Sequence, residues 1–215
     1  MNSASAFWRN SISCATLLVL TIAAFQHVER VSEQRGADLF AAAERGEAAH
    51  VDRLLARGAN PDIRRERDHD TPLLLAARAG HLDVVKRLVD AGAAVNQTHD
   101  AMGSPLQAAV LNSQTDVVGF LLSRGADPNQ RNRLGDPVLG LAAARGAPAV
   151  LRLLLETGAD PNAQSRDGWT PLMYAWSDDR EAVQVLVEYR ARGTTRRLDP
   201  KPIRAASAQG WSDKG

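Results

Sequence analysis

The chain has 215 residues and an almost balanced charge, with 26 lysines and arginines against 25 aspartates and glutamates. That length allows one large domain or two small ones, and the balance excludes a protein that binds nucleic acid or acidic membranes through its overall charge. A single cysteine excludes an internal disulfide framework and a cysteine-based zinc site. The 36 alanines indicate a helical body, because alanine has the highest intrinsic helix propensity.

The N-terminal residues contain an uncharged, mostly apolar run over 12–25 that follows Arg9. A charge, a short apolar stretch and a polar flank are typical of a secretory signal. As a helix the run would be about 21 Å long, which is shorter than a hydrocarbon core of about 30 Å. Extended to 11–28 it nearly spans that core. We therefore expect 1–35 to be a signal peptide or a single-pass membrane anchor, with a buried core helix as a less favoured alternative.

The orientation of such an anchor follows less directly from the sequence. Arg9 precedes the apolar run, while Arg30 and Arg35 follow it, so the positive-inside rule barely separates the two orientations. The arginine-rich, lysine-poor composition and the export signal favour a bacterial cell-envelope protein. We expect it in the periplasm, or anchored in the inner membrane and facing the periplasm. An anchored protein that faces the cytoplasm is the alternative.

The rest of the chain repeats with a period of 33 residues, counted from Thr71. Leucine recurs at positions 73, 106, 139 and 172, and glycine recurs at positions 92, 125 and 158. An earlier unit precedes Thr71 over 37–70, and 201–211 matches the first half of a further unit. The predicted division is 37–70, 71–103, 104–136, 137–169 and 170–200, followed by a partial capping unit and tail over 201–215.

Each unit has the local signals of two short helices. Thr71 and Pro72 provide an N-cap oxygen and a first-turn proline, and small residues follow in the first helix. Gly80 breaks the chain before a second helix, whose apolar residues recur at helical spacing. Gly92 is expected to end that helix in the left-handed conformation, and Ala-Asp-Pro-Asn segments after the equivalent glycines are typical of turns. Neither helix can bury its apolar face alone, so the units must stack.

These columns resemble the ankyrin-repeat family, whose pattern is close to D-x-x-G-x-T-P-L-H-L-A-A-x-x-G-H-x-x-V-V-x-x-L-L-x-x-G-A-D-x-N. The match covers about 37–200. The resemblance implies an all-α solenoid in which each unit contributes a β-turn finger and an antiparallel helix pair. Two departures bear on the local structure. Arg190 stands where the family has the C-cap glycine, so we expect that turn to differ. The histidine of T-P-L-H is replaced throughout, by Leu74, Gln107, Gly140 and Met173.

No motif of a catalytic, cofactor or metal site is found in the sequence. There is no nucleophile elbow, phosphate-binding loop or dinucleotide fingerprint, and the five histidines form no metal-binding pair. The basic segment at 64–67 is interpreted as a solvated loop. The basic run at 190–204 is interpreted as a solvated cap, with an acidic protein or a lipid headgroup as the less favoured ligand. A stack of repeats also offers a shallow face instead of an enclosed pocket. We therefore expect no enzyme activity and no cofactor.

The resemblance implies that a protein partner binds the finger tips and the exposed side of the first helices. Those faces recur in register, so one partner can contact several units. Trp169 is either an interface anchor or packed against a neighbouring finger. The motif columns give these candidate partner-binding residues: Arg67, Asp68, Asp70, Arg78, Asp100, Leu111, Asn112, Arg133, Leu134, Asp136, Arg145, Arg166, Asp167, Trp169, Ser177 and Asp178.

The sequence thus predicts a protein-binding module whose partner is unidentified. The alternative is an accessory or regulatory subunit that protects or localises one specific enzyme in the cell envelope. Arg133, Arg145 and Arg166 come from successive units and are candidates for a basic ladder that meets an acidic partner. We expect a monomer that binds no nucleic acid and that contacts a membrane only through 11–28, if that segment is not cleaved.

Overall fold

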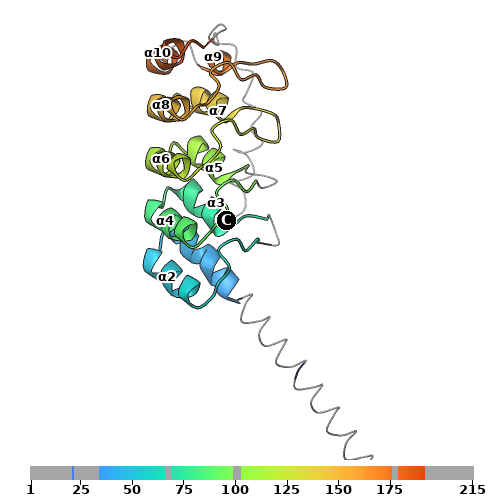
Figure 1. Ribbon diagram of the computed structural model, residues 1–215, viewed down its shortest axis with the longest axis vertical. Coiled ribbons are helices and arrows are strands. Elements are labelled where there is room, and N and C mark those ends of the chain that lie inside the picture. Colours follow the sequence, from blue (N-terminus) through green and yellow to red (C-terminus); the bar gives the residue numbers. More distant parts are fainter. Residues whose placement is uncertain (1–20, 22–33, 66–68, 99–102, 176–178, 192–215) are drawn as a thin grey trace, which may run out of the picture.

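The computed structural model describes residues 21, 34–65, 69–98, 103–175 and 179–191. Within these ranges the chain is a stack of antiparallel helix pairs, so the predicted all-α solenoid is confirmed (Figure 1). Helical residues 34–45 precede the following helices: α2 (Ala48–Ala56), α3 (Pro72–Ala79), α4 (Leu82–Asp90), α5 (Pro105–Leu111), α6 (Thr115–Ser123), α7 (Val138–Ala144), α8 (Pro148–Glu156), α9 (Pro171–Tyr174) and α10 (Arg180–Glu188).

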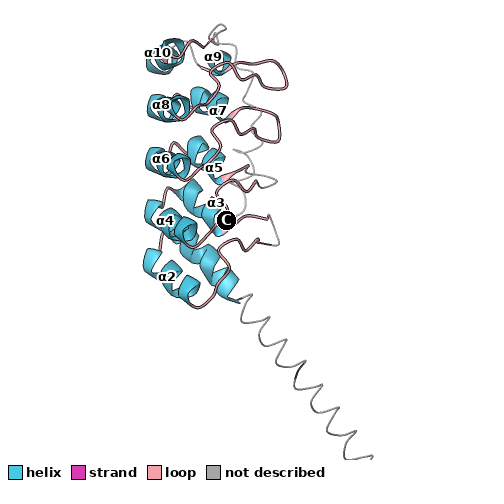
Figure 2. Ribbon diagram, in the orientation of Figure 1, coloured by secondary structure: helices cyan, strands magenta, loops and turns pink. Residues whose placement is uncertain are grey.

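The helices form two layers, with loops projecting from one side (Figures 1 and 2). The first helices of successive pairs, α3, α5, α7 and α9, pack side by side and are called the inner helices. The second helices, α2, α4, α6, α8 and α10, form the outer layer. The long loops between pairs are called the fingers and lie on the inner-helix side. In one finger, an isolated antiparallel bridge joins Arg131 and Pro137.

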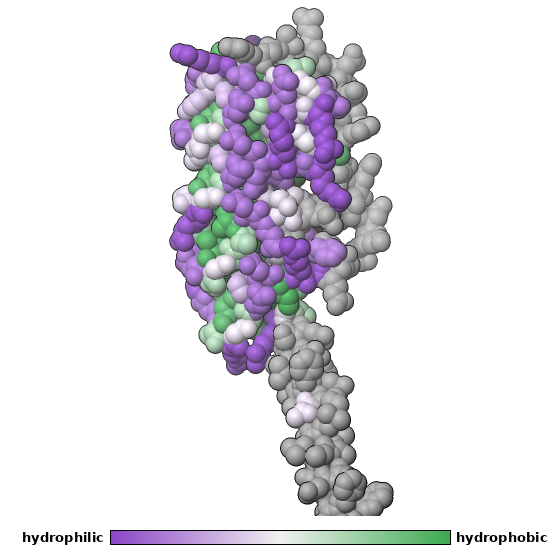
Figure 3. Space-filling view, turned by 45° about the vertical axis from the view of Figure 1, so that its right-hand side comes forward, coloured by the Kyte–Doolittle hydropathy of each residue, from purple (hydrophilic) through white to green (hydrophobic). Residues whose placement is uncertain are grey.

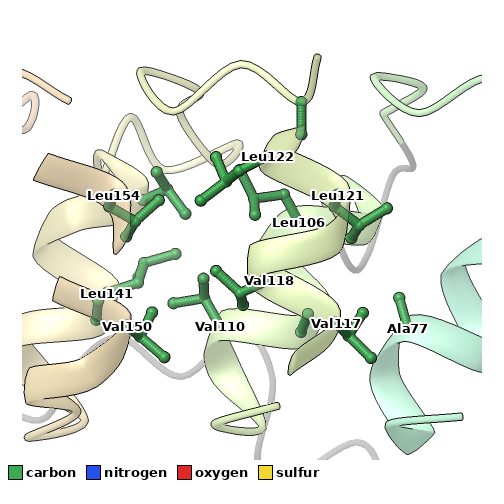
Figure 4. Close-up of a cluster of buried hydrophobic side chains, with 14 of the residues drawn as sticks. Ala77, Leu106, Val110, Val117, Val118, Leu121, Leu122, Leu141, Val150 and Leu154 are labelled. Carbon is green, nitrogen blue, oxygen red and sulfur yellow. The ribbon is translucent and has the colours of Figure 1, made fainter. Parts of the chain in front are cut away.

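The core runs continuously through the stack because the same columns are apolar in each unit. Leu73, Leu106 and Leu139 are at most 1% exposed. Burying each such leucine contributes roughly 1.5–3 kcal/mol to folding. Ala109 and Ala142 are fully buried, and their small side chains let neighbouring inner helices approach closely. Figure 4 shows leucines and valines of α5, α6, α7 and α8 meeting in this core.

The predicted helix boundaries are found where the local signals place them. Thr71 Oγ1 accepts a hydrogen bond from Leu74 N (3.3 Å) at the start of α3. Ser104 forms a capping box with Gln107, which replaces the family histidine and whose Oε1 accepts from Ser104 N (3.1 Å). Gly92 has φ of 94°, which confirms its predicted left-handed role after α4. Proline and a hydroxyl side chain therefore start these inner helices, and glycine follows the outer ones.

The turn after α10 corrects the expectation for Arg190. This arginine adopts the left-handed conformation itself, with φ of 62°. Ala191 N donates to Leu186 O (2.9 Å), and Ala159 N makes the equivalent bond to Leu154 O (2.9 Å) after α8. The turn is thus the same as in the glycine-containing units, because the backbone hydrogen bond and the packing of Ala191 against the core outweigh the left-handed strain.

A ladder of asparagine side chains joins successive units at the base of the fingers. Asn96 Oδ1 accepts from Asp127 N (2.9 Å), and Asn96 Nδ2 donates to Gly125 O (2.8 Å). Asn129 makes the same two bonds to the next unit, at 2.9 and 3.1 Å. These asparagines end the turn segments that follow α4 and α6, so the turn chemistry there also fixes the spacing between units.

Three predictions for the chain ends lie outside the described residues. The apolar run 12–25 is described only at Thr21, and the partial capping unit over 201–215 is not described. Within the described part, no helix combines the length and the apolar character needed to cross a bilayer. The signal or anchor, its orientation and the five-unit division with a cap stay predictions.

Candidate protein-binding face

The candidate face comprises the finger tips and the ends of the inner helices, and we call it the finger face. Its described finger segments are 69–70, 131–136 and 164–169. The last two of these finger tips are tight turns, in which Gly135 N donates to Asn132 O (2.9 Å) and Gly168 N donates to Ser165 O (3.0 Å). Figure 3 shows that this side of the stack is mostly hydrophilic. The sequence-predicted residues Arg67, Asp68, Asp100, Ser177 and Asp178 lie outside the described residues.

Two of the predicted partner-binding residues are engaged in the fold. Asp70 is 3% exposed, and its carboxylate accepts a hydrogen bond from Arg65 Nη2 (3.1 Å). Arg78 is an ion-pair donor to Glu44 in the preceding helical segment, with 3.0 Å between Nη2 and Oε1. Both side chains therefore stabilise contacts inside the stack, and Asp70 offers almost no surface to a partner.

Asp136 is also used within the structure, by Tyr174 of α9. The Tyr174 hydroxyl donates to Asp136 Oδ1, and Asn132 Nδ2 donates to Asp136 Oδ2 (3.0 Å). Burial, followed by the hydrogen bond with Asp136, raises the pKa of the Tyr174 phenol above its usual value. The carboxylate thus ties a finger to α9, a role that its position in the motif did not reveal.

Trp169 has a packing role that the sequence left open. Its ring is half-buried and meets the Tyr174 ring edge-on, with 5.6 Å between centroids and 61° between planes. Its backbone N donates to Ser165 Oγ (3.1 Å), which closes the finger. Edge-to-face aromatic pairs stabilise by about 0.5–1.5 kcal/mol beyond their area. Trp169 therefore holds its own finger against α9, and only part of the ring remains for a partner.

The remaining predicted residues are at least partly accessible. Asn112 is exposed, although its Nδ2 donates to Ala108 O (2.8 Å) in its own helix. Leu111 and Leu134 are half-buried. The exposed charged members are Arg133, Arg145, Arg166 and Asp167.

Arg131 also belongs to the finger face, although the sequence analysis did not predict it as a partner-binding residue. Its Nη1 donates to Gly135 O (3.0 Å) in its own finger and to Gln164 O in the next finger. The guanidinium therefore bridges two finger tips. No recurring signal marks it, because its column holds Thr98 in the preceding unit and Gln164 in the following one.

The side chains of the finger face suit recognition better than chemistry. They offer guanidinium donors, an amide and a carboxylate on an open surface, whereas catalysis usually requires excluded water. Within the described ranges, no three His, Cys, Asp or Glu side chains gather closely enough to hold a metal ion.

Comparison with known proteins supports the same interpretation. A family model described as ankyrin repeats (3 copies) matches residues 39–132 and 128–197, which include α2 to α10. A search of curated proteins finds no match to this chain.

Proposed function

The chain belongs to the ankyrin-repeat family, and from this we propose that it recognises a protein partner through its finger face. Ankyrin repeats are generally protein-interaction modules and are typically not enzymes. The finer proposal is that one partner lies across several units and contacts exposed side chains that the fold does not use. The partner itself is unidentified.

One observation carries this assignment to the finger face. Arg145, Arg166 and Asp167 are exposed and lie at the two ends of the fourth predicted unit, in columns that the family uses for binding. In the outer layer, by contrast, arginines pair with carboxylates of the neighbouring unit, such as Arg124 with Asp90 (2.8 Å). The finger face therefore retains hydrogen-bonding capacity for a partner, and arginine is a frequent interface anchor.

The test is site-specific photo-crosslinking of the full chain in its native cells. A photoreactive amino acid replaces Arg145 or Arg166 on the finger face, and Arg53 or Arg180 on the outer helices serves as the matched control, because all four are exposed arginines. We expect a discrete crosslinked protein from the finger-face positions only. Equal crosslinking from the outer positions, or none from the finger face, would contradict the proposal.

Reversing the charge of one arginine then tests whether the finger face contributes to binding or merely lies near the partner. Arg145→Glu is expected to reduce the yield of the crosslink formed from position 166, while Arg180→Glu leaves it unchanged. Circular dichroism provides the folding control for both variants. Trp169→Ala is a poor probe of binding, because its ring also packs on Tyr174.

We further propose that the repeats are exported or tethered to a membrane by the N-terminal segment. The support is the apolar run 12–25 and its polar flanks. Fractionation of cells that make the full chain, combined with protease treatment of spheroplasts, tests this. We expect the repeats in the periplasm, or in the membrane fraction of spheroplasts where added protease digests them. Repeats that are recovered in the cytoplasm and are protected from the protease would contradict export.

A further inference from the structure

We propose that residues 201–211 of this chain pack as a further inner helix on the end of the stack formed by α9 and α10. The inference goes beyond the proposed function, because it concerns a contact within the chain. It also concerns a segment beyond the region that the family model matches, which ends at residue 197. Residues 192–215 lie outside the described residues. The inference is carried by the apolar end of the described stack and by the sequence that follows it.

The last helix pair presents apolar side chains, Met173, Val183 and Val187, which we call the open end. Val187 is 56% exposed, and the other two are partly exposed. In the earlier units the columns of Met173 and Val183 are buried throughout. Their buried members are Leu74, Gln107 and Gly140 in the first column, and Val85, Val118 and Leu151 in the second. Columns that are buried in these units and exposed in the last one indicate a surface that a further unit covers.

The opposite end of the stack has a polar residue where the open end has none. His50 of α2 stands in the column of Val84, Val117 and Val150, which are at most 1% exposed. Figure 4 shows Val117 pointing toward Ala77 of the preceding unit, so this column faces backward along the stack. His50 Nδ1 lies 3.1 Å from Glu47 Oε2. A terminal unit requires a polar outer face, so the N-terminal end is finished and is a poor match for the open end of a second copy.

The chain after α10 has the spacing of another inner helix. Ala159 and Ala191 make the same backbone hydrogen bond after α8 and α10. Pro171, which starts α9, follows Ala159 by 12 residues, and Pro202 follows Ala191 by 11. The segment 202–210 begins with proline, contains several alanines and ends with glycine, as α3 and its C-cap do. The sequence therefore returns to the inner-helix pattern where the next unit is due.

The packing of the inner helices determines which residue of this segment would meet Met173. Gly140 of α7 lies under the ring of Tyr174 in α9, where an added Cβ would be 2.9 Å from Cδ2. One unit further along, Met173 takes the place of Gly140, and Ala205 takes the place of Tyr174. In this register Ala205 packs on Met173.

The sizes of these two side chains are complementary. A small residue in α7 meets a large one in α9, whereas a large Met173 would meet a small Ala205. The same order of large and small occurs earlier in the stack, where the equivalent positions of α3 and α5 hold Leu74 and Ala108, both fully buried. Close packing requires such alternation of volumes between facing positions.

The experiment measures how fast a small thiol reagent modifies position 173 in the full chain. Cys14→Ser removes the natural cysteine, Met173→Cys introduces the probe, and Glu188→Cys provides an exposed reference in the same unit. Each rate is divided by the rate of the same variant unfolded in urea, which removes differences in intrinsic reactivity. We expect position 173 to react at least about tenfold more slowly than position 188, since a packed residue reacts only when the structure opens locally.

Two changes beyond α10 then test whether 201–211 provides this protection. Ile203 stands in the column of Leu73, Leu106 and Leu139, which are at most 1% exposed, so Ile203→Asp places a charge where packing is expected. It should raise the reaction rate at position 173 severalfold. Lys214→Asp, which introduces the same residue outside the matched half-unit, should leave the rate unchanged. Circular dichroism provides the folding control for both variants.

Four outcomes would overturn the inference. Position 173 could react as fast as position 188, or Ile203→Asp could leave its protection unchanged. Protection that appears only as the protein concentration rises, together with a dimer in light scattering, would assign the open end to a second copy. Protection in a cell extract that the purified chain lacks would assign it to another protein. The photo-crosslinks from positions 145 and 166 test the proposed function independently of these results.

Discussion

The ring of Tyr174 in α9 occupies the space above Gly140 in α7, where an added Cβ would lie 2.9 Å from Cδ2 of the ring. Gly140 stands where the family pattern has histidine. A glycine inside a helix costs about 1 kcal/mol relative to alanine, so its presence here requires a compensating contact. The tyrosine ring supplies that contact, and its hydroxyl donates to Asp136 in the finger before α7.

We expect Gly140→Ala to destabilise the protein by about 1–3 kcal/mol, because overpacking outweighs the gain in helix propensity. Urea unfolding measures the change. In the background of Tyr174→Ala, where the ring is absent, the same substitution should be neutral or stabilising. Equal effects in both backgrounds would show that the ring does not determine the cost.

The pH dependence of stability should depend on Tyr174. Its pKa is raised in the folded state, chiefly by burial, so between the ordinary tyrosine pKa near 10 and the folded value the native state binds more protons than the unfolded state. Stability contributed by this group is therefore complete below that range and is lost as pH rises through it. Thermal unfolding at alkaline pH should show a shallower loss in Tyr174→Phe. Identical pH profiles for the two proteins would contradict this prediction.

Asn129→Ala should remove two hydrogen bonds between units and destabilise the stack by about 1–3 kcal/mol, since each such bond contributes about 0.5–1.5 kcal/mol. Asn129→Asp keeps the acceptor for Asp160 N and loses the donor to Gly158 O, so a smaller effect is expected. Asp62, whose Oδ1 accepts from Ala94 N (2.8 Å), shows that aspartate fits this role. Denaturant unfolding of the two variants tests the order, and a larger loss for Asn129→Asp would contradict it.

Two substitutions in the turns after the outer helices should have opposite effects on stability. Arg190→Gly should stabilise the protein by about 1 kcal/mol, because glycine adopts positive φ without the penalty that a Cβ causes. Gly125→Val should destabilise it, since its φ is 84° and a β-branched residue resists that conformation. No atom lies within 4 Å of the Cβ position at Gly125, so the effect there is one of backbone strain. If differential scanning calorimetry shows that both substitutions shift Tm in the same direction, the assignment of a left-handed turn to these positions is contradicted.

The helix pairs were predictable because their signals are local. Thr71, Pro72, Gly80 and Gly92 mark starts and ends of helices within one unit, and each has the expected conformation. The expectation for Arg190 was wrong because a propensity was weighed without the helix and core that hold the turn. Local preference determines where a helix can end, but packing determines whether a disfavoured residue adopts the backbone conformation that the turn requires.

The candidate face was only partly predictable, for a physical reason. Arg78 is hydrogen-bonded to Glu44, which lies 34 residues away in the sequence, and Tyr174 is hydrogen-bonded to Asp136, which lies 38 residues away. Such pairs depend on how one unit is stacked on the next and on which way each side chain points. The sequence alone therefore determined the repeat, its helix boundaries and the columns of the face. The tertiary structure decided which charged side chains in those columns bond to a neighbouring unit and which, as at Arg145 and Arg166, stay exposed.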